Sequence, residues 1–182
     1  MNAILVTRRL TLRLFELHDA AAVQELAGHK KIAETTLHIP HPYKAGMAES
    51  WIESLIADRE NGRQYAYAIC ENSLGGLIGT CALGQDRANR NAELSYWIGV
   101  PFWNMGFGTE ACRSLVGEGF NTLDIDKIYS VHFAGNPASG RLMQKIGMKV
   151  EGVLRQHIIK WEVPQDLVYY GILRKEFEVA EP

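Results

Sequence analysis

The chain has 182 residues, which fits a single domain over residues 1–182, and 47% of them are hydrophobic, enough for a folded core. This composition excludes a disordered chain. A formal net charge of -2, without a large basic cluster, gives no electrostatic reason for nucleic-acid binding, so we expect no nucleic-acid partner.

The apolar segments predict neither a signal peptide nor a membrane span, because each is too short. The cysteines, Cys70, Cys81 and Cys112, all lie in apolar segments and never form a C-x-x-C pair. This pattern predicts buried, reduced thiols. We therefore expect a cytoplasmic protein with no membrane partner.

The first third of the chain predicts one strand and two helices. Residues 10–14 alternate between leucine and polar side chains, as in a strand with one buried face. Asp19 suits the N-cap of a helix that continues to about Leu26, and residues 51–56 carry apolar side chains at helical spacing. Residues 29–45, which contain several histidines and prolines, are expected to be irregular.

Three strands in succession are predicted next. Residues 64–71 alternate, residues 77–83 are apolar, and residues 92–100 form the third segment. A turn at 72–76 and a polar connection at 84–91 join them. Short connections between consecutive strands predict an antiparallel meander.

The pattern then changes to alternating helices and strands. A helix begins at about Phe107, a strand follows at 127–133 as in a βαβ unit, and a second helix covers 136–147. Two strands at about 148–160 and 166–175 complete the chain. The order β-α-α-β-β-β-α-β-α-β-β predicts an α+β fold with about seven strands, mostly antiparallel, and about four helices on both faces.

A glycine turn connects the predicted strand at 92–100 to the helix that begins near Phe107. Gly106 and Gly108 give the backbone freedom to turn and allow a ligand to approach main-chain N–H groups. The N-terminus of a helix favours phosphate. The segment matches neither a dinucleotide-binding nor a P-loop motif, because it lacks a third glycine and a following lysine.

Five segments in a fixed order carry a family resemblance. They are residues 9–13, 92–98, 102–111, 136–148 and 166–170. Together they resemble the GCN5-related N-acetyltransferases (GNAT), and within them the RimJ/RimL branch, which includes ribosomal-protein N-terminal acetyltransferases. The resemblance covers nearly the whole chain. It implies a sheet that splays between the fourth and fifth predicted strands.

The resemblance also implies acetyl-CoA as the acyl donor. The family loop reads Q/R-x-x-G-x-G/A, whereas Trp103 stands at its first position here and Met105 replaces a frequent basic residue. The resemblance implies that backbone N–H groups bind the pyrophosphate, those of Met105, Gly106, Phe107, Gly108 and Thr109. It further implies that pantetheine pairs with the backbone of Trp97, Ile98, Gly99 and Val100.

Acetyl transfer requires a neutral amine, donors for the oxyanion and stabilisation of the leaving thiolate. An α-amine with a pKa near 7.7–8.0 is neutral in roughly a tenth of molecules at pH 7, whereas a lysine amine is neutral about once in several thousand. An N-terminal amine therefore demands less of a catalytic base.

Glu93 is the predicted base, acting directly or through water; the alternative is a salt-bridged or edge-exposed glutamate. By resemblance to the family's N-x-x-S motif, Ser139 is the predicted acid, although it could only hydrogen-bond the sulfur or stand as a first-turn serine. Asn136 suits a helix N-cap, and the resemblance adds a hydrogen bond to the cofactor arm.

Other candidates are weaker. His157 lies in a predicted strand, where it is either a base or a structural side chain. Three more histidines, His29, His38 and His41, match no common zinc pattern, so we expect no metal. Aromatic residues either line an acceptor pocket or pack in the core; these are Trp51, Tyr65 and Tyr67.

These observations predict an acetyl-CoA-dependent N-acetyltransferase that acts by direct attack in a ternary complex. The expected acceptor is a protein N-terminal α-amine. Two alternatives stay open: a small amine such as a polyamine, amino acid or antibiotic, or a non-catalytic acyl-CoA-binding module. The acceptor pocket is expected at about 29–60 and 160–166, which carry no recognisable code, and the protein is either a monomer or a homodimer.

Overall fold

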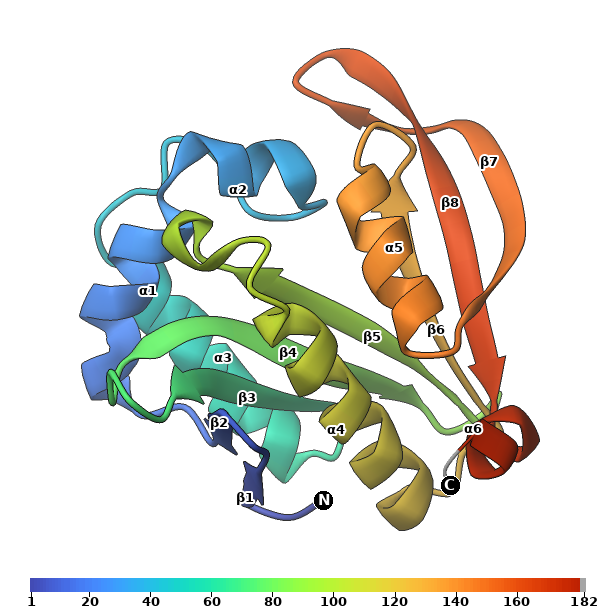
Figure 1. Cartoon of the computed structure of the whole chain (residues 1–182). Coiled ribbons are helices and arrows are strands. Elements are labelled where there is room, and N and C mark those ends of the chain that lie inside the picture. Colours follow the sequence, from blue (N-terminus) through green and yellow to red (C-terminus); the bar gives the residue numbers. More distant parts are fainter. Residues whose placement is uncertain (181–182) are drawn as a thin grey trace.

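An eight-stranded sheet organises the molecule in the order β1-β2-β3-β4-β5-β6-β8-β7 (Figure 1). The computed structural model describes residues 1–180, with side chains described to residue 177. The strands are β1 (Ile4–Val6), β2 (Leu10–Arg13), β3 (Gln64–Glu71), β4 (Leu77–Asp86), β5 (Asn91–Ile98), β6 (Lys127–Phe133), β7 (Lys149–Lys160) and β8 (Val163–Leu173). The α-helices are α1 (Ala20–Ala27), α2 (Lys30–Thr35), α3 (Met47–Glu60), α4 (Phe107–Thr122), α5 (Pro137–Lys145) and α6 (Arg174–Ala180).

All seven predicted strands and four predicted helices are present, so the predicted fold class is confirmed. Three short elements escaped prediction, namely β1, α2 and α6. The expectation that residues 29–45 are irregular is wrong for α2, whose N-cap His29 accepts a hydrogen bond from the Lys31 N–H. Asp19 occupies the N-cap position of α1 as predicted, but its carboxylate makes no capping hydrogen bond to α1 and binds Arg13 at 2.7 Å instead.

Several predicted boundaries shift by a few residues. The polar connection expected at 84–91 is shorter, since β4 continues to Asp86. The strand predicted at 92–100 ends at Ile98, because a 3-10 turn that contains Pro101 occupies Val100–Phe102. Two residues of the strand predicted at 166–175 belong instead to α6.

The sheet splays between β5 and β6. These two strands are parallel and pair over only three positions, Asn91↔Lys127, Ala92↔Ile128 and Glu93↔Tyr129. The strands then diverge, as Figure 1 shows, with α5 beside β6 and α4 beside β5. The predicted splay between the fourth and fifth predicted strands is thereby confirmed.

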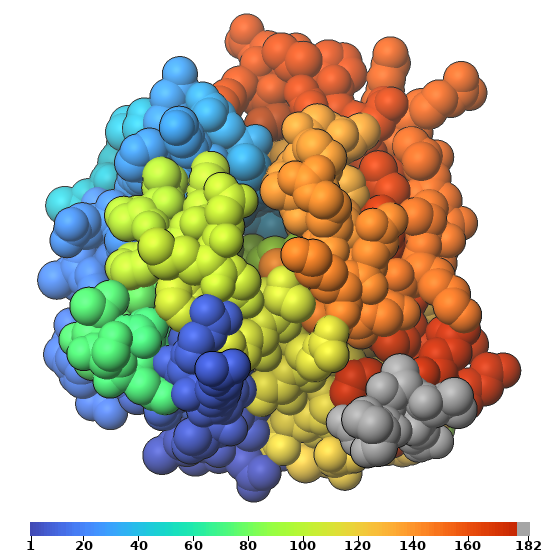
Figure 2. Space-filling model, in the orientation of Figure 1, coloured from blue at the N-terminus to red at the C-terminus, as the bar shows by residue number. Residues whose placement is uncertain are grey.

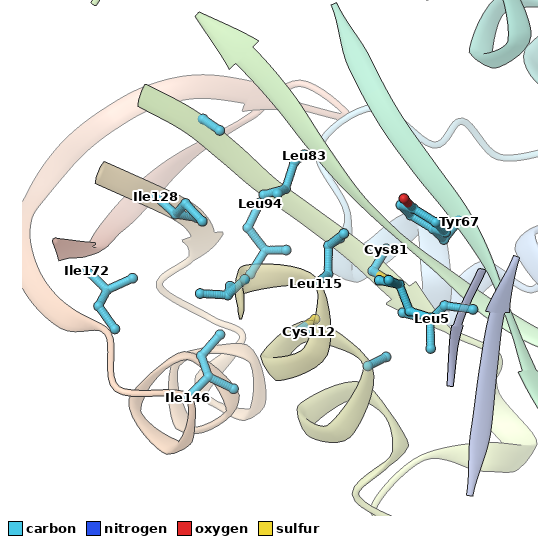
Figure 3. Packing of buried hydrophobic residues seen from close by; sticks show 14 of the residues in the cluster. Leu5, Tyr67, Cys81, Leu83, Leu94, Cys112, Leu115, Ile128, Ile146 and Ile172 are labelled. Carbon is cyan, nitrogen blue, oxygen red and sulfur yellow. The ribbon is translucent and has the colours of Figure 1, made fainter. Parts of the chain in front are cut away.

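The two faces of the central strands differ in side-chain size. On the face that packs against α4, β3 to β5 carry large side chains such as Tyr67, Leu83 and Leu94, which belong to the same buried cluster as Leu115 of α4 (Figure 3). On the face toward α1 and α3, the same strands carry small side chains such as Ala66 and Ala82. This alternation follows from the two-residue period of a strand.

The three cysteines are buried free thiols, as predicted. Burial raises the pKa of Cys81 and Cys112. These thiols therefore stay protonated and act as small core side chains. Within residues 1–180, no helix combines the length and the apolarity that crossing a membrane would need.

Candidate active site

A cavity of about 450 Å³ lies where β5 and β6 diverge. Figure 2 shows the surface hollowed between the yellow-green segment that precedes α4 and the orange helix α5. Both predicted catalytic residues, Glu93 and Ser139, line this cavity. They come from opposite faces of the sheet, because Glu93 shares the α1–α3 face with Trp97, whereas Ser139 lies on α5 against Tyr96.

Glu93 lies in a row of residues that crosses four strands. The register places Gln64, Gly84, Glu93 and Tyr129 side by side on β3, β4, β5 and β6. Burial, and then the charge of Glu93, raise the pKa of Tyr129. In the described part of the chain Glu93 forms no ion pair, so the salt-bridged alternative does not hold there. Its role as a base stays a prediction.

Ser139 is paired with a tyrosine that sequence reasoning missed. The Tyr96 hydroxyl lies 2.5 Å from Ser139 Oγ, and it also donates to the Ser139 carbonyl at 3.3 Å. Burial raises the pKa of Tyr96, and the hydrogen bond with Ser139 offsets only part of this effect. The phenol therefore stays protonated at neutral pH and can donate to Ser139. Alternation along β5 indicates the face of Tyr96 but not its contact with a residue 43 positions away.

Asn136 is the N-cap of α5, as predicted. Its side-chain oxygen accepts a hydrogen bond from the Ser139 N–H at 3.4 Å, and its amide donates to the Thr35 carbonyl at 3.4 Å. The second contact connects α5 to the end of α2 across the splay. The hydrogen bond to a cofactor arm stays a prediction.

The glycine turn adopts the conformation that the sequence indicates. Gly106 is the N-cap of α4 with φ 80°, a left-handed backbone that glycine accepts without strain. The first helical hydrogen bond runs from the Glu110 N–H to the Gly106 carbonyl. The N–H groups of Phe107, Gly108 and Thr109 thus precede the helical ladder, which is the arrangement that binds phosphate.

Gly108 also has a packing role. A Cβ atom at this position would lie 2.9 Å from Leu142 Cδ1 and 3.3 Å from Ile98 Cγ1. Glycine therefore allows the first turn of α4 to approach both β5 and α5. The predicted contacts of Met105, Gly106, Phe107, Gly108 and Thr109 with pyrophosphate stay predictions.

Arg9 lies beside the glycine turn, where its charge is paired with that of Glu110. Its Nε donates to Glu110 at 2.7 Å, its Nη1 donates to the Met105 carbonyl at 2.9 Å, and its guanidinium lies 4.5 Å from the centre of the Phe107 ring. Burial raises the pKa of Glu110, but hydrogen bonds from Thr7 and Arg9 outweigh it, so the pKa lies below its usual value. The contact of Arg9 with the loop was not predicted from the sequence, because Arg9 precedes the loop by almost a hundred residues.

The backbone of β5 presents alternate residues to the splay. The Gly99 N–H donates to the Ile78 carbonyl at 2.8 Å, so Gly99 and Trp97 direct their backbone groups toward β4. Tyr96 and Ile98 direct theirs toward the gap, where the Ile98 carbonyl accepts from Trp103 Nε1 at 2.6 Å. Pairing with pantetheine would therefore use Tyr96 and the Ile98 N–H rather than Trp97 and Gly99. Pairing of pantetheine with the backbone of residues 97–100 stays a prediction, but the backbone groups of Trp97 and Gly99 point toward β4 and not toward the gap.

The remaining histidine candidates are dispersed. His157 is exposed on β7 and lies outside the cavity lining, whereas His38 lines the cavity. In residues 1–177, whose side chains the structure describes, no group of three or more His, Cys, Asp or Glu is placed to hold a metal ion. Of the aromatic candidates, Trp51 lines the cavity, while Tyr67 is buried in the core on the opposite face and Tyr65 packs against that core.

His132 is a buried cavity residue that the sequence did not single out. It is 5% exposed, and its Nδ1 lies 2.7 Å from the Phe133 carbonyl. Its Nε2 has no hydrogen-bond partner among the described residues and lies beneath α5, where a Cβ on Gly140 would approach it to 2.9 Å. An alternating strand segment gives no signal for such a position.

Comparison with known proteins identifies the class. The acetyltransferase (GNAT) domain model matches residues 9–149. The chain is 31% identical over 182 residues to "Putative ribosomal N-acetyltransferase YdaF" of Bacillus subtilis, covering 95% of this chain and 96% of that protein. The chain therefore belongs to the GNAT family and is an acetyl-CoA-dependent N-acetyltransferase.

Solved structures share the fold. The ribosomal L7/L12 α-N-protein acetyltransferase RimL in complex with coenzyme A aligns with a TM-score of 0.86 at 17% identity, over 93% of this chain and 97% of that chain. The microcin C7 self-immunity acetyltransferase MccE in complex with acetyl-CoA and AMP aligns with a TM-score of 0.84 at 22% identity, over 92% and 93%. Both neighbours thus hold the coenzyme on this fold.

Proposed function

We propose that this enzyme acetylates the α-amine at the N-terminus of a protein, by direct attack on acetyl-CoA in a ternary complex. One observation carries the proposal: Glu93 and Ser139 line the same cavity from opposite faces of the sheet. An amine can then enter from the α1–α3 face while the thioester enters from the side of α4 and α5.

The chain's own residues fit acetyl-CoA, which would supply an activated acetyl group. The glycine turn offers N–H groups for the pyrophosphate, and Arg9 fixes this turn through the Met105 carbonyl and Glu110. The Ser139 hydroxyl, which accepts a hydrogen bond from Tyr96, would donate its own proton in a hydrogen bond to the leaving sulfur. Glu93 would accept the proton of the amine, directly or through water.

Two considerations favour an α-amine over a lysine. Its lower pKa leaves about a tenth of the molecules neutral at pH 7, so one partly exposed carboxylate can serve as the base. The name of YdaF refers to ribosomal acetylation, and RimL is described as an α-N-protein acetyltransferase. We extend these two descriptions to this enzyme and propose that its substrate is a cytoplasmic protein.

A thiol-release assay tests the proposal. The panel contains a peptide with a free N-terminus and an internal lysine, the same peptide with a blocked N-terminus, and small amines. We expect thiol release with the free peptide and none with the blocked one. Release with small amines alone would support the small-amine alternative, and acetyl-CoA binding without any transfer would support the non-catalytic one.

A further inference from the structure

The floor at the acceptor end of the cavity comes from β3, β4 and β5, and small residues separate Gln64 from Glu93 there. Gln64, Gly84 and Glu93 form one row across β3, β4 and β5, and Ala82 and Ser95 pair in the next row. Gly84 is not itself a lining residue, but it lies between the lining residues Gln64 and Glu93, and a Cβ atom on it would meet nothing within 4 Å. The φ angle of Gly84 is not left-handed, so the backbone conformation does not require glycine at this position.

The walls above this floor are mostly apolar. They come from α1, from α3 and from the segment between α2 and α3, and they include Val23, Ala27, Ile39, Tyr43, Met47 and Trp51. This surface suits an uncharged side chain, because burying a charge without a partner is costly.

The charges of the lining are sparse. Among the described residues that line the cavity, Glu93 is the one carboxylate, and no Lys or Arg is present. A single carboxylate suits one ammonium group, so a second cation, as in a polyamine, has no partner there. A substrate carboxylate or phosphate likewise finds no guanidinium or ammonium group among these lining residues, and the nearby Lys160 ammonium already donates to the carbonyls of Thr36, Leu37 and Ile39.

Gln64 adds a feature suited to a peptide. Its side-chain amide can donate and accept hydrogen bonds, which matches the N–H and C=O of a peptide bond. Because Gln64 stands across Gly84 from Glu93, a substrate whose amine lies at Glu93 would place its next polar groups near Gln64.

We infer that the enzyme selects a peptide whose first residue has an uncharged, largely apolar side chain, with the space over Gly84 as the subsite for that residue. The inference rests on the proposed function, since it specifies the acceptor of the same site. It places peptides beginning with Asp or Lys, and polyamines, among the poor substrates.

The test compares kcat/KM for hexapeptides that differ only in their first residue, which is Gly, Ala, Leu, Asp or Lys. Spermidine and phenethylamine complete the panel. We expect the Asp and Lys peptides and spermidine to be about 10-fold or more poorer than the Ala and Leu peptides. Equal kcat/KM for charged and apolar first residues would overturn the inference. Reaction of phenethylamine alone would instead overturn the proposed function.

Two substitutions test where the subsite for the first residue lies. Gly84→Leu should raise the KM of the Leu peptide about 10-fold more than that of the Gly peptide, with an unchanged KM for acetyl-CoA. Gly152→Leu is the matched control, since it is also a strand glycine with open space around its Cβ but lies on β7. Gln64→Glu should raise the relative rate with spermidine. A loss in Gly84→Leu that is the same for every first residue would contradict the subsite.

Discussion

At the scale of single residues, the hydroxyl pair of Tyr96 and Ser139 is the contact that most directly suggests a role at the leaving sulfur. We expect Ser139→Ala and Tyr96→Phe each to lower kcat on the order of 10- to 100-fold, because a preorganised donor is removed. The Kd for acetyl-CoA should stay nearly unchanged. Single-turnover rates and calorimetric Kd values separate the two effects, and equal losses in both would indicate a binding role instead.

A second prediction at the scale of single residues concerns Glu93. Replacing it by Gln should lower kcat about 100-fold at pH 7, where most α-amine molecules carry a proton that must be removed. The deficit should shrink above pH 8, because the amine is then neutral without help. Rates measured from pH 6.5 to 9.5 check this, with Glu53→Gln on the exposed side of α3 as the control. A constant deficit across that range would remove Glu93 as the base.

At the scale of elements, the N-terminal turn of α4 is fixed by the segment between β1 and β2. Glu110 accepts hydrogen bonds from the Thr7 hydroxyl, the Arg9 backbone and the Arg9 side chain, at 2.7, 2.9 and 2.7 Å. The helix dipole favours an acidic residue at this position, but these three contacts show a more specific task. They hold the glycine turn against a distant part of the chain.

This contact predicts a pH-dependent stability. The pKa of Glu110 is lower in the folded state than its usual 4.5, so its stabilisation is full above that pH and disappears as pH falls through the folded pKa. Glu110→Gln should cost about 1 kcal/mol at pH 7, a Tm decrease of about 2–4 °C for a chain of this size. Melting curves from pH 7 to 3 should show the difference vanishing, and a difference that grew toward low pH would contradict the assignment.

The long strands could be predicted from the sequence, whereas the short elements could not. The strands β3, β4 and β5 were predictable because each has a long apolar or alternating segment bounded by turn residues. β1 has three residues and α2 has six, too few for a period to emerge. Glu93 was proposed from its place on the strand that leads into the cofactor site, and Ser139 from the N-x-x-S motif; the structure places both in one cavity.

The partners of those two residues were not predictable. The row of Gln64, Gly84 and Glu93 depends on strand register, and a bulge at Ile69 and Cys70 shifts that register within the β3–β4 pair. Tyr96 and Ser139 meet only because the strands splay and bring α5 over β5. Contacts of this kind follow from tertiary packing, which local patterns do not encode.

At the scale of the whole molecule, the cavity lies between two halves that share one buried core but have a short strand pairing. The strand pairing between them covers three positions, from Asn91↔Lys127 to Glu93↔Tyr129. Beside this seam, Arg90 binds Asp124 at 2.8 Å and Asp126 at 2.7 Å. At the other end of the cavity, the amide of Asn136 reaches the Thr35 carbonyl. The halves are thus held at both ends of the space in which the reaction takes place.

Of the contacts between the two halves described here, those of Lys160 join the residues that lie farthest apart in the sequence. From the end of β7 its Nζ donates to the carbonyls of Thr36, Leu37 and Ile39 at 3.0, 3.3 and 3.0 Å. Burial lowers the pKa of Lys160, and the three carbonyls accept its hydrogen bonds. Because these residues line the acceptor end of the cavity, the β7–β8 hairpin holds that wall in place.

Lys160→Met should therefore loosen residues 36–43 without unfolding the sheet. We expect faster hydrogen exchange in this segment and a several-fold higher KM for the acceptor, because binding would then have to order the wall. The KM for acetyl-CoA should not change, since the glycine turn of α4 lies in the other part of the site. Lys149→Met is the matched control, because Lys149 lies on the same strand but pairs with Glu176 at 2.6 Å, away from the cavity. Unchanged exchange in 36–43, or an equal rise in both KM values, would show that the hairpin does not shape the acceptor site.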